Sequence, residues 1–379
     1  MNADVDAIVI GGGLVGSAIA YGFGRLGKRV AVLDEGDVAY RATRGNFGLV
    51  WVQGKGDGVP EYARWSRLSA DLWPAFAAEL KAAAGIDVAH TKPGGLHLCL
   101  GEDELAARDA MMQRLRREAG NAGYEYEMLD HRRVAELLPG AGPAVAGASY
   151  TPYDGHANPL LLLRALHRLL PESGGFYRPG GRIEAIDAAP RRFAVRTPAG
   201  LVAAPCLVLA AGLGNRTLGA MLGLNVPVTP LKGQIMVTER IDAAAAGAAF
   251  AMPTTSIRQT ADGGVMLGDS HEDAGFDTAS SVPVMRQIAE RAVASFPFLR
   301  DVQVVRSWAA LRVMTPDGLP VYQESRLYPG AFVGTCHSGV TLAAAHALHL
   351  APALAGGDGI PEELAARFGD GRFGVPAAA

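Results

Sequence analysis

Near the start of the chain, short and fully apolar runs stand on either side of one helix-length segment. Ala7–Ile10 is apolar without interruption, which is typical of a strand buried on both faces. Residues 14–26 carry mostly small and apolar side chains over the length of a helix, and Gly27 follows as a stop. Residues 30–33 form a second apolar run. The order strand, helix, strand predicts a βαβ unit with two parallel strands.

Glycines occupy the turn between the first predicted strand and the helix. Gly11, Gly13 and Gly16 have the spacing G-x-G-x-x-G, which serves a tight turn, a close approach of backbone to a pyrophosphate, and packing of helix on strand. The start of the helix adds N–H donors and a positive dipole. Asp34, after the second strand, can accept hydrogen bonds from a ribose diol, with Glu35 as the weaker choice. This combination predicts a dinucleotide site.

Three later segments favour FAD over NAD as the dinucleotide. Residues 41–51, RATRGNFGLVW, form a polar loop of small residues suited to wrapping the diphosphate and ring edge of an extended cofactor. Residues 204–219 indicate a buried strand that ends in Ala-Ala-Gly before a helix. Residues 330–356 indicate a strand, a turn with Gly334 and Gly339, and a helix whose dipole suits the pyrimidine end of a flavin.

Composition narrows the class of protein further. The chain has 379 residues, enough for two domains of roughly 100 to 200 residues each. The formal net charge is -3, so the basic excess that nucleic-acid binding needs is missing. No apolar run approaches the roughly 20 residues of a membrane span, and the N-terminus has no signal-peptide pattern. We therefore expect a globular intracellular protein with no nucleic acid partner and no transmembrane segment.

The cysteines bear on redox compartment and metal binding. Cys99, Cys206 and Cys336 are the only three and show no paired spacing. This distribution fits a reducing compartment and excludes a cysteine-ligated cluster within the chain. No metal site is predicted.

Several local strings carry a family resemblance that runs essentially from end to end. The chain resembles the D-amino acid oxidase (DAO) superfamily of FAD-dependent oxidoreductases, in the branch of glycine oxidase and sarcosine oxidase. Within that branch it is most similar to the β (flavin) subunits of D-hydroxyproline dehydrogenase and opine oxidase, through GNFGLVWVQGKG, GGLHLCL, IRQT and CHSGVTLAA. The flavin subunit of hydrogen cyanide synthase is a further relative. The resemblance implies FAD as cofactor and a carboxylate-bearing small-molecule substrate.

The resemblance also implies which residues contact FAD. The ADP half is expected along the glycine turn, the acid and the end of the later strand: Gly11, Gly13, Leu14, Val15, Gly16, Asp34, Glu35, Ala211 and Gly212. The pyrophosphate and ring are expected along Thr43, Arg44, Asn46 and Gly48. The flavin is expected along Gly334, His337, Ser338, Gly339, Val340 and Thr341. Thr43 and Arg44 have an alternative interpretation as solvated loop residues.

Because the cofactor segments are far apart in the sequence, the domain that they form must be discontinuous. We predict an α/β fold with a Rossmann-like FAD-binding domain of the glutathione-reductase-like DAO type, made of residues 1–85, 148–224 and 327–379. Residues 86–147 and 225–326 are predicted to form an inserted substrate domain on a mixed, largely antiparallel sheet. Residues 302–314 are expected to be a strand pair within it.

Arg312 is the main candidate for holding the substrate. It stands in the apolar string WAALRVM, where an unpaired guanidinium is costly, so it requires an anionic partner or a water-filled site. Its planar fork suits a carboxylate. The resemblance implies this role, because glycine oxidase-like enzymes grip a carboxylate with the arginine of W-A-G-L-R-P-x-T-x-D-G, and this chain has W-A-A-L-R-V-M-T-P-D-G. The alternative is a structural ion pair with Asp317 or another acid.

Three further side chains are candidates for the catalytic site. Arg258, in IRQT, is either a second carboxylate ligand for a dicarboxylate such as an opine, or a surface charge. His337, in the turn predicted against the flavin, would tune the ring, contact substrate or act as an acid or base, with packing as the alternative. His97, in GGLHLCL, either points into the site or is a satisfied histidine of a sheet.

The leading functional hypothesis is an FAD-dependent amino-acid dehydrogenase or oxidase. It would oxidise the C–N bond of an amino or imino acid, such as D-hydroxyproline, D-proline or an opine, by hydride transfer to flavin N5. One alternative is a flavin-dependent 2-hydroxy-acid dehydrogenase with His337 or His97 as base. Others are a glycine or sarcosine-type oxidase that produces H2O2, and a non-catalytic FAD-binding subunit.

Two absences bear on cofactor attachment and on the electron acceptor. Some sarcosine oxidases attach FAD to a cysteine near the Thr-Pro-Asp region, but here no cysteine lies between Cys206 and Cys336, so non-covalent FAD is expected. Those oxidases also have an oxygen-activating lysine where this chain has Met266, which favours a carrier other than O2. Relatives of the dehydrogenase type imply further subunits that carry electron-transfer cofactors. The expected protein is therefore part of a cytoplasmic hetero-oligomer. An alternative is that its partner subunits attach it to the inner membrane.

Overall fold

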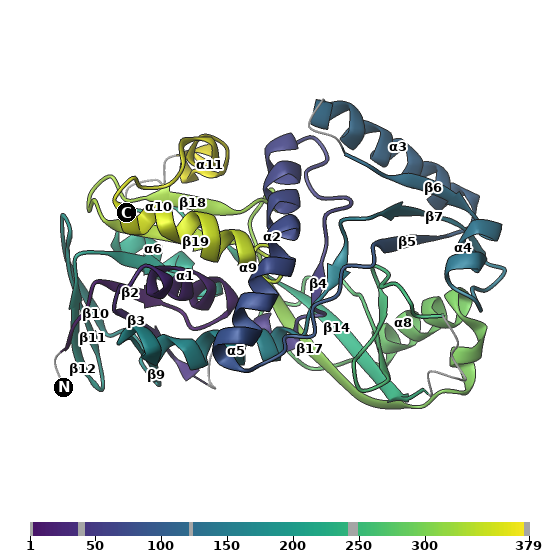
Figure 1. The fold of residues 1–379 in the computed structure, drawn as a ribbon, viewed down its shortest axis with the longest axis horizontal. Helices are drawn as coiled ribbons and strands as arrows, with labels where there is room; N and C mark the ends of the chain where they lie inside the picture. Colours follow the sequence, from purple (N-terminus) through teal and green to yellow (C-terminus); the bar gives the residue numbers. More distant parts are fainter. Residues whose placement is uncertain (1–2, 37–41, 121–123, 242–248, 375–379) are drawn as a thin grey trace.

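A computed structural model describes residues 3–36, 42–120, 124–241 and 249–374. Arg41, the first residue of the loop predicted over residues 41–51, lies outside the described residues. The chain forms an elongated body with two halves rich in β-structure and a long helix between them (Figure 1).

A six-stranded sheet organises the first half, in the order β18-β19-β13-β2-β3-β9. Neighbouring strands are parallel except β18 and β19. The strands are β2 (Ala7–Ile10), β3 (Val30–Asp34), β9 (Phe176–Pro179), β13 (Leu207–Leu209), β18 (Val321–Glu324) and β19 (Ala331–Thr335). The inner strands β2, β3, β13 and β19 are buried along their whole length, as expected of a parallel sheet covered on both faces. The βαβ prediction is confirmed.

Helix α1 joins β2 to β3 and packs on this sheet. The helices of this half are α1 (Leu14–Arg25), α2 (Pro60–Ala84), α5 (Pro159–Leu169), α6 (Asn215–Met221), α9 (Ala343–Ala345), α10 (Ala351–Gly356) and α11 (Glu362–Phe368). Short 3-10 turns are η2 (Ala42–Gly45), η4 (Leu170–Ser173), η5 (Gly212–Gly214), η6 (Pro297–Asp301) and η8 (Asp370–Phe373).

The last predicted helix is not one regular α-helix. Between α9 and α10 the chain forms a π-helical turn, η7 (His346–Leu350). Pro352 stands in the first turn of α10 and has no N–H to donate to the preceding turn. A wider turn before the proline accommodates the missing hydrogen bond.

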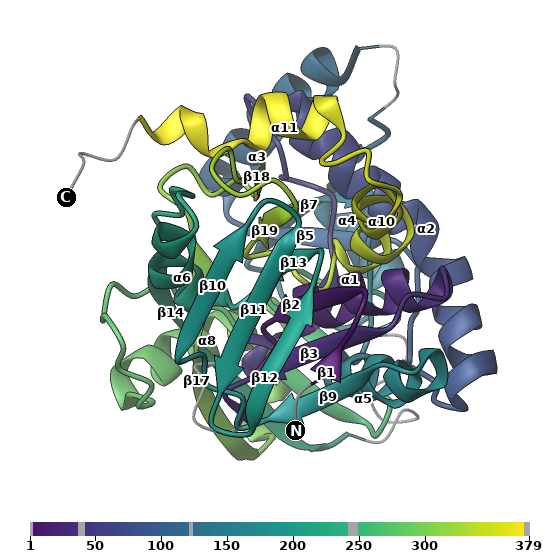
Figure 2. The same ribbon diagram turned by 90° about the vertical axis from the view of Figure 1, so that its left-hand side faces the viewer.

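A small four-stranded sheet closes the outer end of the first half (Figure 2). Its order is β1-β12-β11-β10, formed by β1 (Ala3–Asp4), β10 (Ala185–Ala189), β11 (Arg192–Thr197) and β12 (Gly200–Ala204).

Two antiparallel sheets form the second half. The larger has the order β15-β16-β14-β17, with β14 (Thr229–Arg240), β15 (Ile257–Gln259), β16 (Gly264–Leu267) and β17 (Val304–Met314). The smaller has the order β5-β7-β6, with β5 (Gly95–Leu100), β6 (Glu127–Asp130) and β7 (Val145–Thr151). The helices α3 (Glu102–Ala119), α4 (His131–Leu137) and α8 (Val282–Ser295) belong to this half (Figure 1).

The strand pair predicted over residues 302–314 is wrong, because β17 is one continuous strand. It pairs with β14 along its whole length, and the pairing shifts register between Val237 and Thr238. Val305 has no partner in β14, so the irregularity is a one-residue bulge in β17 itself rather than a turn.

The two halves meet where η2 packs against β17. A Cβ atom added at Gly45 would lie 2.1 Å from the Ala310 Cβ, so only glycine allows this close approach. A two-stranded sheet of β4 (Leu49–Val50) and β8 (Gly155–His156) lies beside it. The division into a cofactor domain and a substrate domain stays a proposal, and β7 runs across its boundary at residue 148.

Candidate functional site

The glycine turn is shaped by contacts that leave no room for side chains. Gly11 has a φ of 110°, and a Cβ there would lie 2.3 Å from the Ala210 carbonyl oxygen. A Cβ at Gly16 would lie 2.0 Å from the Gly11 carbonyl oxygen. A Cβ at Gly13 would come no closer than 3.3 Å, to Thr43 Oγ1. Gly11 and Gly16 are therefore needed by the fold, whereas Gly13 keeps the space in front of the turn open.

The start of α1 offers backbone donors to a phosphate. Gly13 caps the helix without a side-chain hydrogen bond, and Val15 lies in its first turn. The N–H of Leu14 donates to Thr43 Oγ1 at 3.1 Å, which ties η2 to the helix start. Thr43 is thus a buried residue with a structural contact, and its interpretation as a solvated loop residue is wrong. Arg44 is exposed on the other side of the same turn.

Asp34 ends β3 beside the glycine turn. Its carboxylate accepts the N–H of Gly12 at 2.6 Å and the N–H of Gly36 at 2.7 Å, and the hydroxyl of Tyr177 donates to it at 3.3 Å. These bonds fix the carboxylate at the carboxyl end of the sheet, where dinucleotides bind in such folds. Glu35 is exposed, so the expected preference for Asp34 agrees with the geometry.

The other predicted ADP contacts lie next to the turn. Ala211 follows β13, and its N–H would be 2.7 Å from a Cβ on Gly11. Gly212 begins η5 with a φ of 59°. The structure therefore brings the glycine turn, Asp34 and residues 211–212 together at one edge of the sheet.

The segment after η2 carries the next predicted contacts. Asn46 Oδ1 accepts the N–H of Gly48 at 2.7 Å, and Gly48 has a φ of 90°. A Cβ on Gly48 would lie 2.4 Å from the Ala157 carbonyl oxygen. Asn46 lines a pocket that is described below, whereas Gly48 is not among the residues that line it.

The segment 334–341 supplies the predicted flavin contacts. Gly334 lies inside β19, so its predicted position at the turn is wrong, while its contact with the flavin stays a prediction. The turn itself comes against the start of α1, since a Cβ on Gly339 would contact Val15. Thr341 Oγ1 accepts the N–H of Trp51 at 3.1 Å, which joins this turn to the segment after β4.

A pocket of about 220 Å³ lies where these segments meet the larger antiparallel sheet. Arg312, Lys55 and His337 are among its lining residues. The others are Ala42, Gly45, Asn46, Phe47, Leu49, Trp51, Gly233, Ile235, Thr255, Asp269, Ala310, Leu311, Ser338, Val340 and Thr341. The pocket thus joins Asn46, after η2, and the predicted flavin contacts of the last turn to the predicted substrate arginine.

Arg312 reaches the pocket from β17. Its Nη1 donates to the Ser270 carbonyl at 2.8 Å, and its Nη2 is paired with the carboxylate of Asp269. The guanidinium lies over Gly233, where an added Cβ would be 2.3 Å from Nη1. The alternative interpretation is an ion pair with Asp317 or another acid: Asp317 pairs with Arg372 at 2.6 Å, and Asp269 is the acid that pairs with Arg312.

Arg258 is not a surface charge, because its side chain is buried beneath the segment after η2. Its Nε donates to the Phe47 carbonyl at 2.5 Å, and the guanidinium lies over the Phe47 ring. Burial lowers the pKa of Arg258 to about 10. It is absent from the residues that line the pocket, so the geometry does not favour it as a second carboxylate ligand.

The two candidate histidines are both neutral at pH 7. Burial lowers the pKa of His337 to about 3, with a further contribution from the charges of Lys55 and Arg312. Burial also lowers the pKa of His97 to about 3. His337 lines the pocket, whereas His97 bonds to Thr255 Oγ1 at 2.8 Å and reaches the pocket only through that hydroxyl.

Lys55 is a pocket residue that the sequence analysis missed. Its Nζ donates to Ser338 Oγ at 2.6 Å and lies 3.4 Å from His337 Nε2. The available signal was a lysine between two glycines in QGKGDG, inside a string already singled out. Its contacts join residues almost three hundred positions apart, which no local pattern reports.

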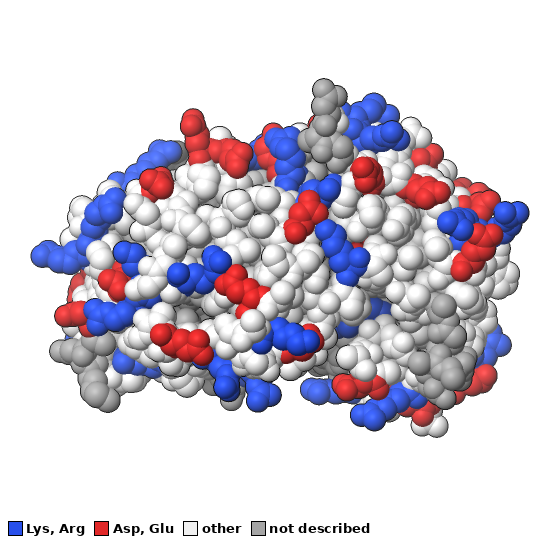
Figure 3. Space-filling model, in the orientation of Figure 1, with Lys and Arg blue, Asp and Glu red and all other residues white. Residues whose placement is uncertain are grey.

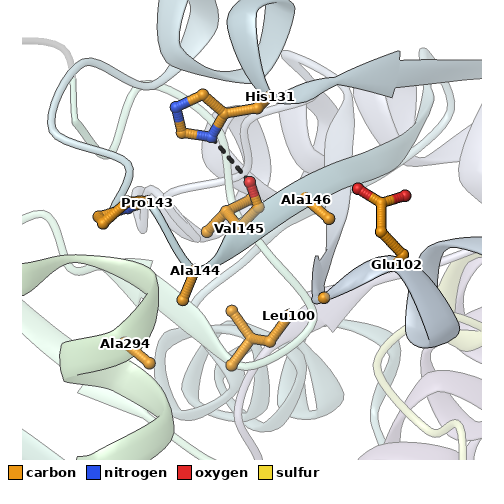
Figure 4. A pocket seen from close by; sticks show the side chains of 9 residues that line it. Leu100, Glu102, His131, Pro143, Ala144, Val145, Ala146 and Ala294 are labelled. Atoms are coloured by element: carbon orange, nitrogen blue, oxygen red, sulfur yellow. Dashed lines mark hydrogen bonds between the residues drawn. The ribbon is translucent and has the colours of Figure 1, made fainter.

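A second cavity, of about 630 Å³, shares no lining residue with the pocket. Its polar side chains are the Glu102 carboxylate and the His131 imidazole, whose Nδ1 is 2.7 Å from the Val145 carbonyl oxygen (Figure 4).

Acidic and basic side chains intermingle over the face of the molecule seen in Figure 3. In the part of the chain that the structure describes, no three His, Cys, Asp or Glu side chains form a metal-binding group. No described helix combines the length and apolarity needed to cross a membrane.

The arrangement fits an extended dinucleotide. The uncapped start of α1 and the fixed carboxylate of Asp34 suit a pyrophosphate and a ribose. The pocket continues from η2 to the turn at 337–341, where a planar ring would meet Leu49, Val340 and backbone groups. Fold and site together define a dinucleotide-dependent oxidoreductase.

Comparison with known proteins agrees with this class. Residues 6–353 match the family model DAO, described as FAD dependent oxidoreductase. The chain is 43% identical over 356 residues to the B subunit of opine oxidase from Rhizobium meliloti, covering 93% of this chain and 94% of that protein. It is 42% identical over 363 residues to the B subunit of opine oxidase from Agrobacterium tumefaciens (strain Ach5), covering 95% of this chain and 96% of that protein. The crystal structure of glycine oxidase from Geobacillus kaustophilus superimposes with a TM-score of 0.85 at 25% identity, covering 97% of this chain and 98% of that one.

The chain belongs to the DAO family of FAD-dependent oxidoreductases. FAD is its cofactor. The predicted family, fold class and cofactor are therefore confirmed, while the roles of individual residues remain predictions.

Proposed function

We propose that this protein oxidises the C–N bond of an amino or imino acid and passes the electrons to a carrier other than O2. The proposal rests on the position of Arg312 in the wall of a pocket that the turn at 337–341 also lines. The relatives named above are opine and glycine oxidases, and opines and glycine both carry a carboxylate next to a C–N bond. D-hydroxyproline and D-proline share this feature.

Arg312 would hold the substrate carboxylate. Its side chain is about a quarter exposed, between the buried residues Leu311 and Val313, so a small anion can reach it. The Ser270 carbonyl restrains the guanidinium from behind. A restrained, planar donor loses little freedom on binding, which favours bidentate recognition of a carboxylate.

Oxidation of a C–N single bond to an imine removes a hydride from the α-carbon and a proton from nitrogen. Bound FAD supplies the acceptor for the hydride. The chain contributes orientation, by fixing the carboxylate beside the α-carbon, and exclusion of water by the apolar walls of Phe47, Leu49 and Ile235.

The charge state of the histidines counts against a 2-hydroxy acid oxidised with His337 or His97 as the base. A hydroxyl proton requires a general base whose pKa is near the working pH. His337 and His97 both have a pKa of about 3, because each is buried, so neither suits that task. A neutral amine needs no such base to release its hydride.

Two further observations support the proposed electron acceptor and the proposed partner subunits. Met266 lies in β16, where some relatives have an oxygen-activating lysine, and it does not line the pocket. The two opine oxidase relatives are each one component of a multi-subunit enzyme, which supports a hetero-oligomer with further electron-transfer subunits. Such partners would also decide whether the protein associates with a membrane.

Anaerobic reduction of the bound flavin tests the proposal. The holoprotein would be mixed with D-hydroxyproline, D-proline, sarcosine, glycine, other D-amino acids and opines, and bleaching near 450 nm, roughly the usual flavin band, would be followed. At least one of them should bleach the flavin. Failure of the whole set to bleach the flavin would contradict C–N oxidation, and activity with 2-hydroxy acids would then favour the alternative. Faster reoxidation by O2 than by a quinone or dye would contradict the proposed acceptor.

A further inference from the structure

Two cations line the same pocket, and among the described residues only one of them forms an ion pair with an acid. Arg312 is paired with Asp269. Lys55 contacts a hydroxyl and an imidazole, and no carboxylate of the described residues forms an ion pair with it. The imidazole is neutral at pH 7, so it does not compensate the ammonium.

An ammonium in this position is costly without an anion. Burial lowers the pKa of Lys55 to about 8 although the charge of Asp154 acts in the opposite direction, so the side chain is still mainly charged at pH 7. A half-buried charge whose neighbours are Ser338 Oγ and the Tyr62 ring is only partly solvated. Its free energy would fall if an anion entered the pocket beside it.

The segment that carries Lys55 is held by a buried polar network. The Asp154 carboxylate accepts the N–H of Val52 and the side-chain amide of Gln53, the latter at 2.7 Å. Arg108, itself buried, donates to Gln53 Oε1 at 2.8 Å. The N–H of Lys55 donates to the Val52 carbonyl at 3.0 Å. Lys55 therefore extends from a rigid segment rather than from a flexible loop.

His337 lines the same pocket as both cations and lies 3.4 Å from Lys55 Nζ. Its pKa is lowered by the charges of both Lys55 and Arg312, so both act on the same part of the pocket. A ligand that contacts both side chains would meet two cations. An amine flanked by two carboxylates has the matching charge pattern.

We propose that Lys55 binds a second carboxylate of the substrate, so that the site selects imino dicarboxylates, in which two carboxylate arms share one nitrogen. The proposal rests on the function proposed above and specifies its substrate class. It assigns to Lys55 the role that the sequence analysis considered for Arg258, which does not line the pocket and whose Nε donates to the Phe47 carbonyl.

Two pairs of small molecules isolate the second carboxylate. Thiodiacetate and methylthioacetate differ only in that group and cannot be oxidised as amines, so they report binding through changes in flavin absorption. Iminodiacetate and sarcosine are the corresponding oxidisable pair. The measured quantity is the ratio of the two dissociation constants in each holoprotein.

Lys55→Met should reduce the preference for thiodiacetate over methylthioacetate roughly 10- to 100-fold, because one charge-assisted hydrogen bond is lost. Lys55→Arg should keep most of the preference. Arg312→Gln should weaken both ligands. Lys81→Met, which removes an exposed lysine of α2, should leave the ratio unchanged. If Lys55→Met does not retain FAD, Lys55→Gln replaces it.

An unchanged ratio in the Lys55 variants would overturn the proposal. Equal weakening of both ligands would also overturn it, because Lys55 would then act on the first carboxylate or on the flavin. Neither result depends on turnover. Conversely, a wild-type protein whose flavin no amino or imino acid bleaches would overturn the proposed function, whatever the binding ratio.

Discussion

Arg312 and Asp269 form an ion pair at the edge of the pocket, between β17 and the segment that follows β16. The acid is 36% exposed at its side chain, while the guanidinium is also held by the Ser270 carbonyl. A substrate carboxylate would therefore meet a cation that is already oriented and partly neutralised. This arrangement makes opposite predictions for the two partners.

Replacing Arg312 by Gln should reduce the efficiency of flavin reduction by the best substrate. Loss of a bidentate, charge-assisted contact costs about 2 to 4 kcal/mol, or roughly 30- to 1000-fold in kcat/KM. Arg306→Gln, which removes an exposed arginine from the same strand, is the matched control and should change it less than about twofold. Stopped-flow reduction of both variants checks this. Equal effects in the two variants would remove Arg312 from the site.

Replacing Asp269 by Asn should strengthen binding of a carboxylate ligand. The substitution removes a competing anion, while the Ser270 carbonyl still orients the guanidinium. Because Asp269 is partly solvated, the gain should be modest, about 0.5 to 1 kcal/mol or roughly two- to fivefold in the dissociation constant of methylthioacetate. A titration of the flavin absorbance measures it. Weaker binding would instead show that Asp269 is needed to position Arg312.

Alanine substitutions of Gly16 and Gly13 should affect different properties, namely the stability of the fold and the affinity for FAD. Gly16→Ala places a Cβ 2.0 Å from the Gly11 carbonyl oxygen, so the protein should lose stability by several kcal/mol or not fold. Gly13→Ala places a Cβ no closer than 3.3 Å to a protein atom, so the apoprotein should melt within a few degrees of wild type. Its FAD affinity should nevertheless fall, because the new methyl group occupies the space in front of the turn. Differential scanning fluorimetry and FAD titration separate the two; normal FAD affinity in Gly13→Ala would count against the assigned pyrophosphate position.

The parts of the site that the sequence could predict are those that local patterns encode. Apolar runs and glycine spacing gave β2, α1 and β3, and the acid that ends β3 faces the glycine turn as expected. An arginine in an apolar strand correctly indicated a nearby anion, although the acid is Asp269 rather than Asp317.

The remaining features depend on tertiary pairing. The ion pair of Asp269 and the pocket position of Lys55 join segments that are distant in the sequence. Whether Arg258 is buried or exposed depends on the segment after η2 that folds over it. Gly334 is predicted to lie at a turn because glycines commonly mark turns, but it lies in a buried strand. No local pattern distinguishes these outcomes.

Arg258 should affect stability rather than substrate choice. Arg258→Gln removes the hydrogen bond to the Phe47 carbonyl and the contact with the Phe47 ring, which should cost about 1 to 3 kcal/mol. Arg240→Gln, at the exposed end of β14, should be neutral. Urea unfolding of the holoproteins, together with the ratio of thiodiacetate to methylthioacetate binding, checks the prediction. A large change in that ratio with unaltered stability would contradict this prediction and would indicate that Arg258 binds a substrate carboxylate.

His346 should make the protein sensitive to acid. The side chain is fully buried, its Nε2 is bonded to the hydroxyl of Tyr322 at 2.7 Å, and its Nδ1 has no partner among the described residues. Burial lowers its pKa from 6.5 to about 3. Between these values the unfolded chain binds a proton that the native protein does not, so stability is lost as the pH falls below 6.5, by about 1.4 kcal/mol per pH unit.

Urea midpoints measured from pH 7 to pH 5 test this sign. His346→Gln should flatten the dependence of unfolding free energy on pH by the slope of one proton, even if its stability at pH 7 is lower, because the titrating group is gone. His349→Gln, in the same helical segment but not fully buried, should leave the slope as in wild type. Parallel curves for all three proteins would mean that His346 is protonated in the native state or stays neutral in both states.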